Sequence, residues 1–363
     1  MEQVNTELNV HKLFSEALDL LKQLIEIPSF SKEEDKTADI IENFFRQHDI
    51  PANRFLNNVW AKNKNFDESK PVVLLNSHHD TVKPNSGYTN DPFEPKEKDG
   101  KLFGLGSNDA GGSLVSLIAV FIHFYDEKNL PFNLIVAATS EEEISGHNGI
   151  EILLPQLPHI SCGIVGEPTL LKMAVAEKGL LVLDCVAWGA AGHAARNEGV
   201  NAIYKAMNDI HWLSTFSFEK DSPFLGRVHM AVTSIHTKNI AHNVVPSECT
   251  FIVDVRVNEC YTFEQVIAEI KNHITSEVMP RSTRLRPSFI EEEHPLVIAG
   301  KKLGIESYGS PTCSDRALMN FPTLKIGPGD SARSHSADEF IFVDEIKSGI
   351  ELYISVLENL KFV

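Results

Sequence analysis

The chain has 363 residues, 42% of them hydrophobic and 23% charged, which is typical of a globular protein large enough for two domains. Its net charge of -17 argues against nucleic acid or an anionic membrane as a partner. No stretch is apolar for long enough to span a bilayer, and the polar first nine residues do not resemble a signal peptide. Together with five scattered cysteines and no C-x-x-C pair, this predicts a cytoplasmic protein with reduced thiols.

Two amphipathic helices are expected first. Apolar residues recur at helical spacing from Leu13 to Ile25, and Pro28 ends that helix. Ser31 with Glu34 matches a capping box that would begin a second helix, whose buried face carries Ile40, Ile41, Phe44 and Phe45.

From about residue 72 to residue 165, apolar runs alternate with helical patterns. Such alternation predicts an α/β fold with a mixed, largely parallel sheet flanked by helices. Each apolar run is expected to be a buried strand that leads into acidic residues, histidine or both. The runs are 71–75, 102–106, 134–138 and 164–165, and a later run at 324–329 belongs to the same sheet.

Residues 173–289 predict an inserted domain of a different kind. Strands are expected at 179–188, 228–235 and 249–257, and helices at 201–213 and after Thr262, which forms a capping box with Gln265. A short strand around 284–286 would complete β-α-β-β-α-β, the ferredoxin-like α+β arrangement. Residues 1–172 and 290–363 would then form a catalytic metal-binding domain, and the insert a lid and dimerisation domain.

Candidate metal ligands follow the predicted strands. His78 and Asp80 lie two residues apart at a strand end, so both side chains point to one side. His78 is a candidate ligand and Asp80 the carboxylate that orients it, whereas the alternative is a polar turn that caps the strand. Asp109 lies in a glycine-rich turn, where it could bridge two ions about 3.5 Å apart or serve only as a turn residue.

The run Glu141-Glu142-Glu143 is the sharpest single pattern. Three adjacent carboxylates at the end of an apolar strand repel one another, and a cation would remove that conflict. One carboxylate can bind the metal while its neighbour takes a proton from a metal-bound water. We assign Glu142 as the base and Glu143 as the ligand, and we expect Glu141 to face solvent. The alternative is a solvated acidic helix start.

Glu167, before Pro168, and His335, after a Gly-Pro-Gly turn, complete the set. Ligands in α/β sheets sit beyond the carboxyl ends of the strands, so these segments are expected to converge there. Nitrogen and oxygen donors suit zinc or a similar divalent ion, and the set is large enough for two metals that share one carboxylate. A one-zinc protease of the H-E-x-x-H type is excluded because that motif is absent.

In this order, the H-x-D turn, the G-x-G-x-x-D-x-x-G segment, the E-E pair, the G-E-P-T segment and the late histidine resemble the M20 metallopeptidase and deacylase family. The resemblance covers nearly the whole chain. It implies that His78, Asp109 and Glu167 hold one zinc, and that Asp109, Glu143 and His335 hold the other. It also implies that Glu142 is the general base and acid, and that Asp80 is oriented on His78.

The insert resembles the family as well. Gly192-His193-Ala194-Ala195 is similar to a segment whose histidine, here His193, reaches a neighbouring active site in dimeric relatives and supports the oxyanion. The resemblance implies substrate contacts for Asn243, Arg256 and Arg316. Two departures are Cys313, inserted into a T-S-D pattern, and Glu141, where relatives more often carry Asp.

Within this family, we expect a zinc-dependent deacylase of N-acyl amino acids that works in arginine biosynthesis. The substrate would be acetylornithine, or an acetyl or succinyl derivative of ornithine or citrulline. Succinyl-diaminopimelate desuccinylase and a dipeptidase or carboxypeptidase are the alternatives, and a non-catalytic metal-binding relative is a remote one. The cofactors would be two divalent ions, zinc first and cobalt or manganese otherwise. A homodimer through the insert is expected, without nucleic acid or membrane partners.

Overall fold

The computed structural model describes residues 2–362, with side chains from residue 10 onward. The chain forms two compact units. The first comprises the described parts of 1–175, 290–308 and 314–363, and the second comprises 176–289 and 309–313. We expected an insert spanning 173–289, whereas residues 173–175 group with the first unit and residues 309–313 with the second.

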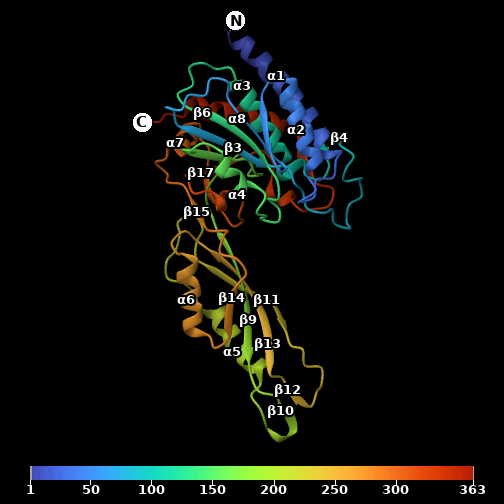
Figure 1. Cartoon of the computed structure of the whole chain (residues 1–363), viewed down its shortest axis with the longest axis vertical. Helices are drawn as coiled ribbons and strands as arrows, with labels where there is room; N and C mark the ends of the chain where they lie inside the picture. Colours follow the sequence, from blue (N-terminus) through green and yellow to red (C-terminus); the bar gives the residue numbers. More distant parts are fainter. Residues whose placement is uncertain (1, 363) are drawn as a thin grey trace. The chain divides into compact units, whose positions relative to one another are not determined.

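A mixed sheet organises the first unit, and a few of its strand residues, 176–177, 288–289 and 309–310, are grouped with the second unit (Figure 1). Its strand order is β1 (Ala52–Phe55), β2 (Asn58–Lys62), β6 (Asn133–Thr139), β3 (Val72–His78), β7 (Cys162–Val165), β17 (Thr323–Lys325), β8 (Met173–Glu177) and β15 (Ser288–Phe289), and β16 (Ser307–Ser310) also pairs with β8. The central strands β6, β3, β7 and β17 pair in parallel, and β1, β2, β8 and β15 pair antiparallel to their neighbours. A mixed sheet with a parallel centre confirms the predicted fold class.

Helices cover this sheet because its central strands are apolar on both faces. Every residue of β3 and β6 is buried. On one face α3 (Gly112–Phe124) lies against β3 and β6 and packs with α1 (Glu2–Ile25) and α8 (Val343–Asn359), and α7 (Pro295–Lys302) packs on α8. Leu74 and Ile135 instead join a cluster with Ile150 and Leu153 of α4 (Ile150–Leu153). α2 (Asp35–Gln47) packs on β1 and β2. None of the described helices combines the length and apolarity needed to cross a membrane.

The apolar run 102–106 does not form a strand of the central sheet, contrary to our expectation. Its first part belongs to β5 (Lys101–Phe103), which lies between β4 (Lys96–Lys98) and β18 (Phe340–Phe342) in a small antiparallel sheet. The rest of the run enters an irregular turn, because Gly104 and Gly106 have φ angles of 150° and 77°. That turn leads to Asp109.

The second unit contains the predicted ferredoxin-like arrangement. Its elements follow as β9 (Gly179–Trp188), α5 (Ala202–Thr215), β11 (His229–His236), β13 (Glu248–Val257), α6 (Phe263–His273) and β14 (Glu277–Pro280), with the antiparallel sheet order β11-β13-β9-β14. Burial alternates along β13 as the sequence predicts. The last strand is β14, not the predicted 284–286, because the buried Val278 supplies the apolar contact to this core.

The two predicted capping boxes have different outcomes. Thr262 and Gln265 exchange the expected hydrogen bonds at the start of α6, of 3.0 and 3.3 Å. The Ser31–Glu34 box is wrong, because α2 begins at Asp35 without a side-chain cap. The Ser31 hydroxyl instead donates to Oδ2 of Asp80 at 2.7 Å, and Glu34 faces the interior with 1% exposure.

Candidate metal centre

Five segments place the expected ligands at one edge of the central sheet. His78 is the last residue of β3, and Glu143 and Glu167 lie in the turns that follow β6 and β7. Asp109 lies in the turn before α3, and His335 lies in the loop between β17 and β18. Because β6, β3, β7 and β17 run parallel, the segments that follow them emerge at the same edge.

The structure brings these side chains together as two groups of three. In the first, His78 Nε2 lies 3.4 Å from Asp109 Oδ1 and 3.8 Å from Glu167 Oε1. In the second, His335 Nε2 lies 2.9 Å from Glu143 Oε2 and 3.7 Å from Asp109 Oδ2. Within each group the ligand atoms lie within 4.8 Å of one another. Asp109 belongs to both groups and offers one oxygen to each, which is the geometry of a bridging carboxylate.

The surroundings of His78 fit a bound cation. Its Nδ1 contacts the backbone carbonyl of Asp80 at 3.0 Å, which directs the lone pair of Nε2 toward Asp109 and Glu167. His78 is 1% exposed, and its Nε2 makes no hydrogen bond to any described residue. Such a buried, unpartnered nitrogen beside two carboxylates is well suited to metal coordination.

Electrostatics in the protein alone also favour positive charge at this place. Burial lowers the pKa of His78, but the neighbouring carboxylates of Asp109 and Asp80 raise it well above its ordinary value. The hydrogen bond with Glu143 raises the pKa of His335 to about 9. Burial, followed by the charge of other carboxylates, raises the pKa of Glu142 well above its ordinary value. In the metal-free protein these shifts all favour bound protons, whose positive charge offsets the negative charge of the carboxylates as divalent ions would.

Asp80 has a different principal contact from the one expected. Its carboxylate lies 3.4 Å from His78 Nδ1, but that nitrogen donates its hydrogen bond to the Asp80 backbone oxygen. The carboxylate itself accepts the backbone N–H groups of Glu142 and Glu143, at 3.0 and 3.1 Å. Asp80 therefore holds the acidic turn as well as His78.

The acidic turn is more buried than the sequence suggested. Glu141 was expected to face solvent, yet it is 5% exposed and its carboxylate accepts a hydrogen bond from the Asn148 side chain at 2.8 Å. Its φ angle of 55° turns the chain sharply after β6. The Glu142 carboxylate lies within the electrostatic influence of His78, Glu167 and Asp315. The role of Glu142 as the base stays a prediction.

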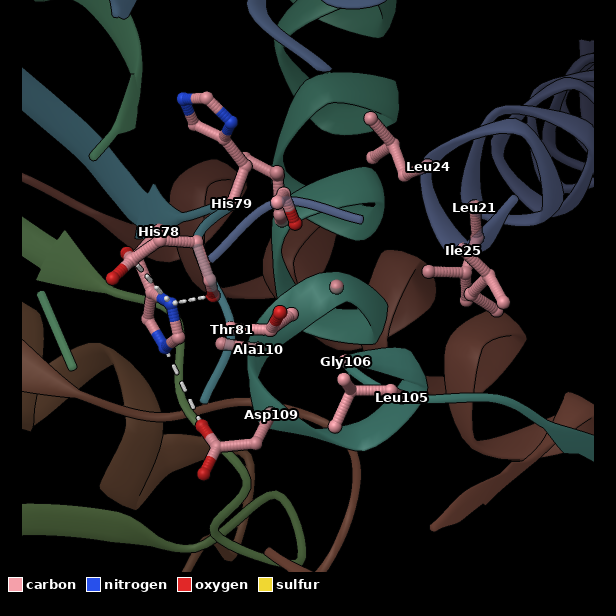
Figure 2. Close-up of a pocket in the computed structure, with 14 residues that line it drawn as sticks. Leu21, Leu24, Ile25, His78, His79, Thr81, Leu105, Gly106, Asp109 and Ala110 are labelled. Carbon is pink, nitrogen blue, oxygen red and sulfur yellow. Dashed lines mark hydrogen bonds and ion pairs between the residues drawn. The ribbon is translucent and has the colours of Figure 1, made fainter. Parts of the chain in front are cut away.

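A small cavity lies behind the first group (Figure 2). It has a volume of about 20 Å³ and lies between His78, Asp109 and the apolar side chains of Leu21 and Ile25 on α1. Thr81 also lines it, and its buried Oγ1 has no hydrogen-bond partner among the described residues. A cavity of this size is large enough for a single water.

Two buried carboxylates near the site were not singled out from the sequence. Glu339 is 2% exposed and accepts the backbone N–H groups of Gly106, Asn108 and Asp109 at 2.9 to 3.1 Å. Burial raises the pKa of Glu339 to about 8. The available signal was an acidic pair, Asp338-Glu339, directly before the apolar residues of β18 and close after His335.

Asp315 is the second of these carboxylates. It accepts hydrogen bonds from the side chains of Asn76 and Thr139, both at 2.8 Å, and burial raises its pKa to about 6. The neighbouring Arg316 was expected to contact substrate. It is 1% exposed, and its guanidinium donates to the backbone oxygens of Ala174 and Val175 at 2.7 Å, so it joins β8 to this loop.

The other three predicted residues belong to the second unit. His193 is exposed and lies in β10 (Gly192–His193), which pairs with β12 (Val244–Val245). Asn243 is close to it, because the Asn243 oxygen accepts the Ala194 N–H at 3.0 Å. Arg256 forms a two-point ion pair with Asp254, at 2.7 and 3.0 Å. Their contacts with substrate stay predictions.

Comparison with known proteins places the chain in a family. The model of peptidase family M20/M25/M40 matches residues 74–359. The chain belongs to this family. Among curated relatives, succinyl-diaminopimelate desuccinylases from Delftia acidovorans and Stenotrophomonas maltophilia are 24% and 25% identical. The alignments cover 96% and 95% of this chain and 98% and 99% of those proteins.

Solved structures share the fold of this M20 protein. Aminopeptidase PepT from Bacillus cereus has a TM-score of 0.77 and 17% identity, and the match covers 96% of this chain and 98% of that one. A dinuclear metal-binding peptidase of the M20 family from Bacillus subtilis has a TM-score of 0.72 and 15% identity, over 97% and 100% of the two chains. The family and the fold class predicted from the sequence are confirmed. Together with the two ligand groups, they identify a metal-dependent hydrolase.

Proposed function

We propose that this M20 protein hydrolyses the amide bond of an N-acyl amino acid with the help of two divalent metal ions. The observation that carries the proposal is the position of Asp109 between the His78–Glu167 pair and the Glu143–His335 pair. Zinc is the first candidate for both ions, because the donors are imidazole nitrogens and carboxylate oxygens, and cobalt or manganese would suit the same donors.

The ions and the side chains of Glu142 and His193 have separate roles in the proposed hydrolysis. The ions would polarise the scissile carbonyl and make the attacking water more acidic. Glu142 accepts a proton from that water and later returns it to the leaving amine, so one water and one amide give a carboxylate and a free amine. Burial raises the pKa of the Glu142 carboxyl, a direction that favours return of the proton to the leaving amine. His193 would support the oxyanion.

We propose N-succinyl-diaminopimelate as the first substrate to test. The supporting observation is that the desuccinylases from Delftia acidovorans and Stenotrophomonas maltophilia align over nearly the whole chain. Acetylornithine, which we expected from the sequence, and the related succinyl and citrulline derivatives are the next candidates. Asn243 and Arg256 are proposed substrate contacts, and Arg256 offers a guanidinium for a substrate carboxylate.

A substrate panel tests this proposal. Metal-loaded protein would be assayed with succinyl-diaminopimelate, the acetyl and succinyl derivatives of ornithine and citrulline, and a dipeptide. The highest kcat/KM is expected for succinyl-diaminopimelate. A dominant dipeptide activity would rule out the deacylase, and metal binding without any hydrolysis would favour a non-catalytic relative. Glu142→Gln is the matched control, expected to keep both metals and to lose about 10² to 10⁴-fold in kcat.

A further inference from the structure

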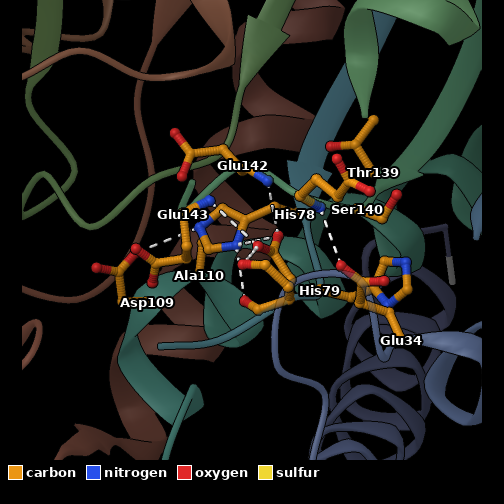
Figure 3. A network of polar contacts seen from close by, with 12 residues as sticks. Glu34, His78, His79, Asp109, Ala110, Thr139, Ser140, Glu142 and Glu143 are labelled. Carbon is orange, nitrogen blue, oxygen red and sulfur yellow. Dashed lines mark hydrogen bonds and ion pairs between the residues drawn. The ribbon is translucent and has the colours of Figure 1, made fainter. Parts of the chain in front are cut away.

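The loop before α2 is joined to the acidic turn by buried hydrogen bonds. Three successive backbone N–H groups of that turn each donate to a carboxylate. The Glu141 N–H donates to Glu34 Oε1 at 3.1 Å, and the N–H groups of Glu142 and Glu143 donate to the two oxygens of Asp80. Figure 3 shows Glu34 beside this turn, on the side away from Asp109. The whole turn is thus held through its backbone.

Both carboxylates are themselves held in place by the loop 29–34. Ser31 donates its hydroxyl to Asp80 Oδ2 at 2.7 Å. Glu34 Oε1 also accepts the Lys32 N–H at 2.7 Å, and Oε2 accepts from the Asn57 side chain at 2.9 Å. A further hydrogen bond joins this loop to the chain that follows β3, because the Thr81 N–H donates to the backbone oxygen of Ser29 at 2.8 Å.

These side-chain contacts do not cap the first turn of α2. Serine and glutamate at these positions normally cap a helix, and a side-chain cap stabilises it. Here α2 has no side-chain cap; the Ser31 side chain contacts Asp80, and the Glu34 side chain contacts the backbone of the turn that carries Glu142 and Glu143. Glu34 is almost fully buried, which is costly for a carboxylate unless hydrogen bonds compensate for lost solvation. Ser31 and Glu34 therefore match the sequence pattern of a helix cap but form hydrogen bonds to distant parts of the chain instead.

We propose that Ser31 and Glu34 are positioning residues that fix Glu142 and Glu143 in their working geometry. The inference rests on the proposed function, since Glu142 would act on the water and Glu143 would hold an ion. Ser31 acts through Asp80, which receives two of the three N–H groups. Glu34 acts through the backbone of Glu141, whose φ of 55° is a conformation that side chains other than glycine rarely adopt. Neither residue touches the reacting atoms.

Variants at both positions test the proposal. Ser31→Ala removes the hydroxyl, and Glu34→Met keeps the side chain's length without its oxygens. Each is expected to lower kcat by about tenfold or more, with KM nearly unchanged, because residues that orient metal ligands and bases have effects of that size. Each should also weaken the binding of one of two zinc ions in calorimetric titration of metal-free protein. In Glu34→Met, which keeps the contacts of Asp80, the other ion, held by His78, Asp109 and Glu167, should bind as in the wild type.

Conservative variants separate positioning from stability. Ser31→Thr and Glu34→Gln retain an oxygen at the required place and are expected to restore most of the lost kcat and zinc affinity. Two matched controls lie away from the ligands. Ser161 accepts the Val72 N–H at the start of β3, and the buried Asp209 accepts the N–H groups of Thr275 and Ser276 in the second unit. Ser161→Ala and Asp209→Asn should lower the unfolding temperature at most, leaving zinc affinity unchanged.

The outcomes are distinct from those that test the proposed function. If the wild type hydrolyses nothing on the panel, the proposed function fails, and the zinc titrations alone still decide the role of Ser31 and Glu34. Wild-type zinc affinity and kcat in Ser31→Ala and Glu34→Met would overturn the inference. So would losses that Ser161→Ala and Asp209→Asn reproduce, or that Ser31→Thr and Glu34→Gln fail to recover.

Discussion

Glu339 Oε1 accepts the backbone N–H of Asp109 at 2.9 Å, although the two residues are 230 positions apart in the sequence. Glu339 follows His335 closely, so one loop supplies both a candidate ligand and the support of another. Asn108 also joins these two loops, because its side chain both donates to and accepts from the backbone of Asp330, each at 3.0 Å. The position of the shared carboxylate therefore depends on the His335 loop.

Replacement of Glu339 should weaken both metal sites. Glu339→Met removes the acceptor for three N–H groups of the Asp109 turn, and we expect about tenfold weaker zinc binding at both sites, since Asp109 belongs to both. Zinc titration of metal-free protein measures this. Asp209→Asn is the control for loss of a buried carboxylate, and an effect on only one ion would contradict the role assigned to Glu339.

Metal stoichiometry should depend on which ligand is removed. Asp109→Ala takes an oxygen from both groups, so fewer than one ion per chain is expected after equilibrium dialysis at limiting metal. His335→Ala leaves His78, Asp109 and Glu167 intact, so one ion should remain. Plasma emission analysis of the dialysed proteins gives the two ratios. Equal ratios for the two variants would show that Asp109 does not bridge.

The location of the site was predictable because it follows from a local rule. Strands that end in His78, or lead to Glu143 and Glu167, are recognised by an apolar run and a polar end, and parallel pairing then brings those ends together. Helix α6 was predictable for a similar reason, since Thr262 and Gln265 are three residues apart and each accepts a hydrogen bond from the other's backbone.

The errors share another physical cause. Ser31 and Glu34 satisfy the pattern of a cap, but the stronger partners, Asp80 and the Glu141 backbone, come from distant parts of the chain. Glu339 and Asp315 act by accepting hydrogen bonds from residues 176 to 239 positions away, and the sequence around each of them does not identify those donors. Buried carboxylates of this kind are found only once the fold is known.

Asp315 should make the metal-free protein less stable as pH rises. Its folded pKa of about 6 exceeds the ordinary value of 3.8, so its stabilising protonated form is fully present below 3.8 and is lost as pH rises through 6. Asp315→Asn retains an oxygen for Asn76 and Thr139 without the charge. At pH 8 the variant should be more stable than the wild type, by up to about 3 kcal/mol, and this advantage should disappear near pH 4.

Denaturant unfolding at pH 4, 6 and 8 measures that difference. The measurement uses metal-free protein, because bound ions would stabilise both variants. A constant difference between Asp315→Asn and the wild type at all three values would mean that the charge of Asp315 is not the cause. Greater stability of the wild type at pH 8 would contradict the direction of its pKa shift.

The proposed homodimer can be tested through His193. If His193 completes the site of a neighbouring protomer, a protomer with Glu142→Gln still offers its histidine, and a protomer with His193→Ala still offers its base. Each variant alone should be nearly inactive. After mixing and subunit exchange, half of the dimers are mixed and each has one complete site, so about a quarter of the wild-type rate should return. Native mass spectrometry confirms that mixed dimers form. If mixed dimers form without recovered activity, His193 does not act in the site of the neighbouring protomer. If the protein is a monomer at assay concentration, the proposed homodimer is wrong.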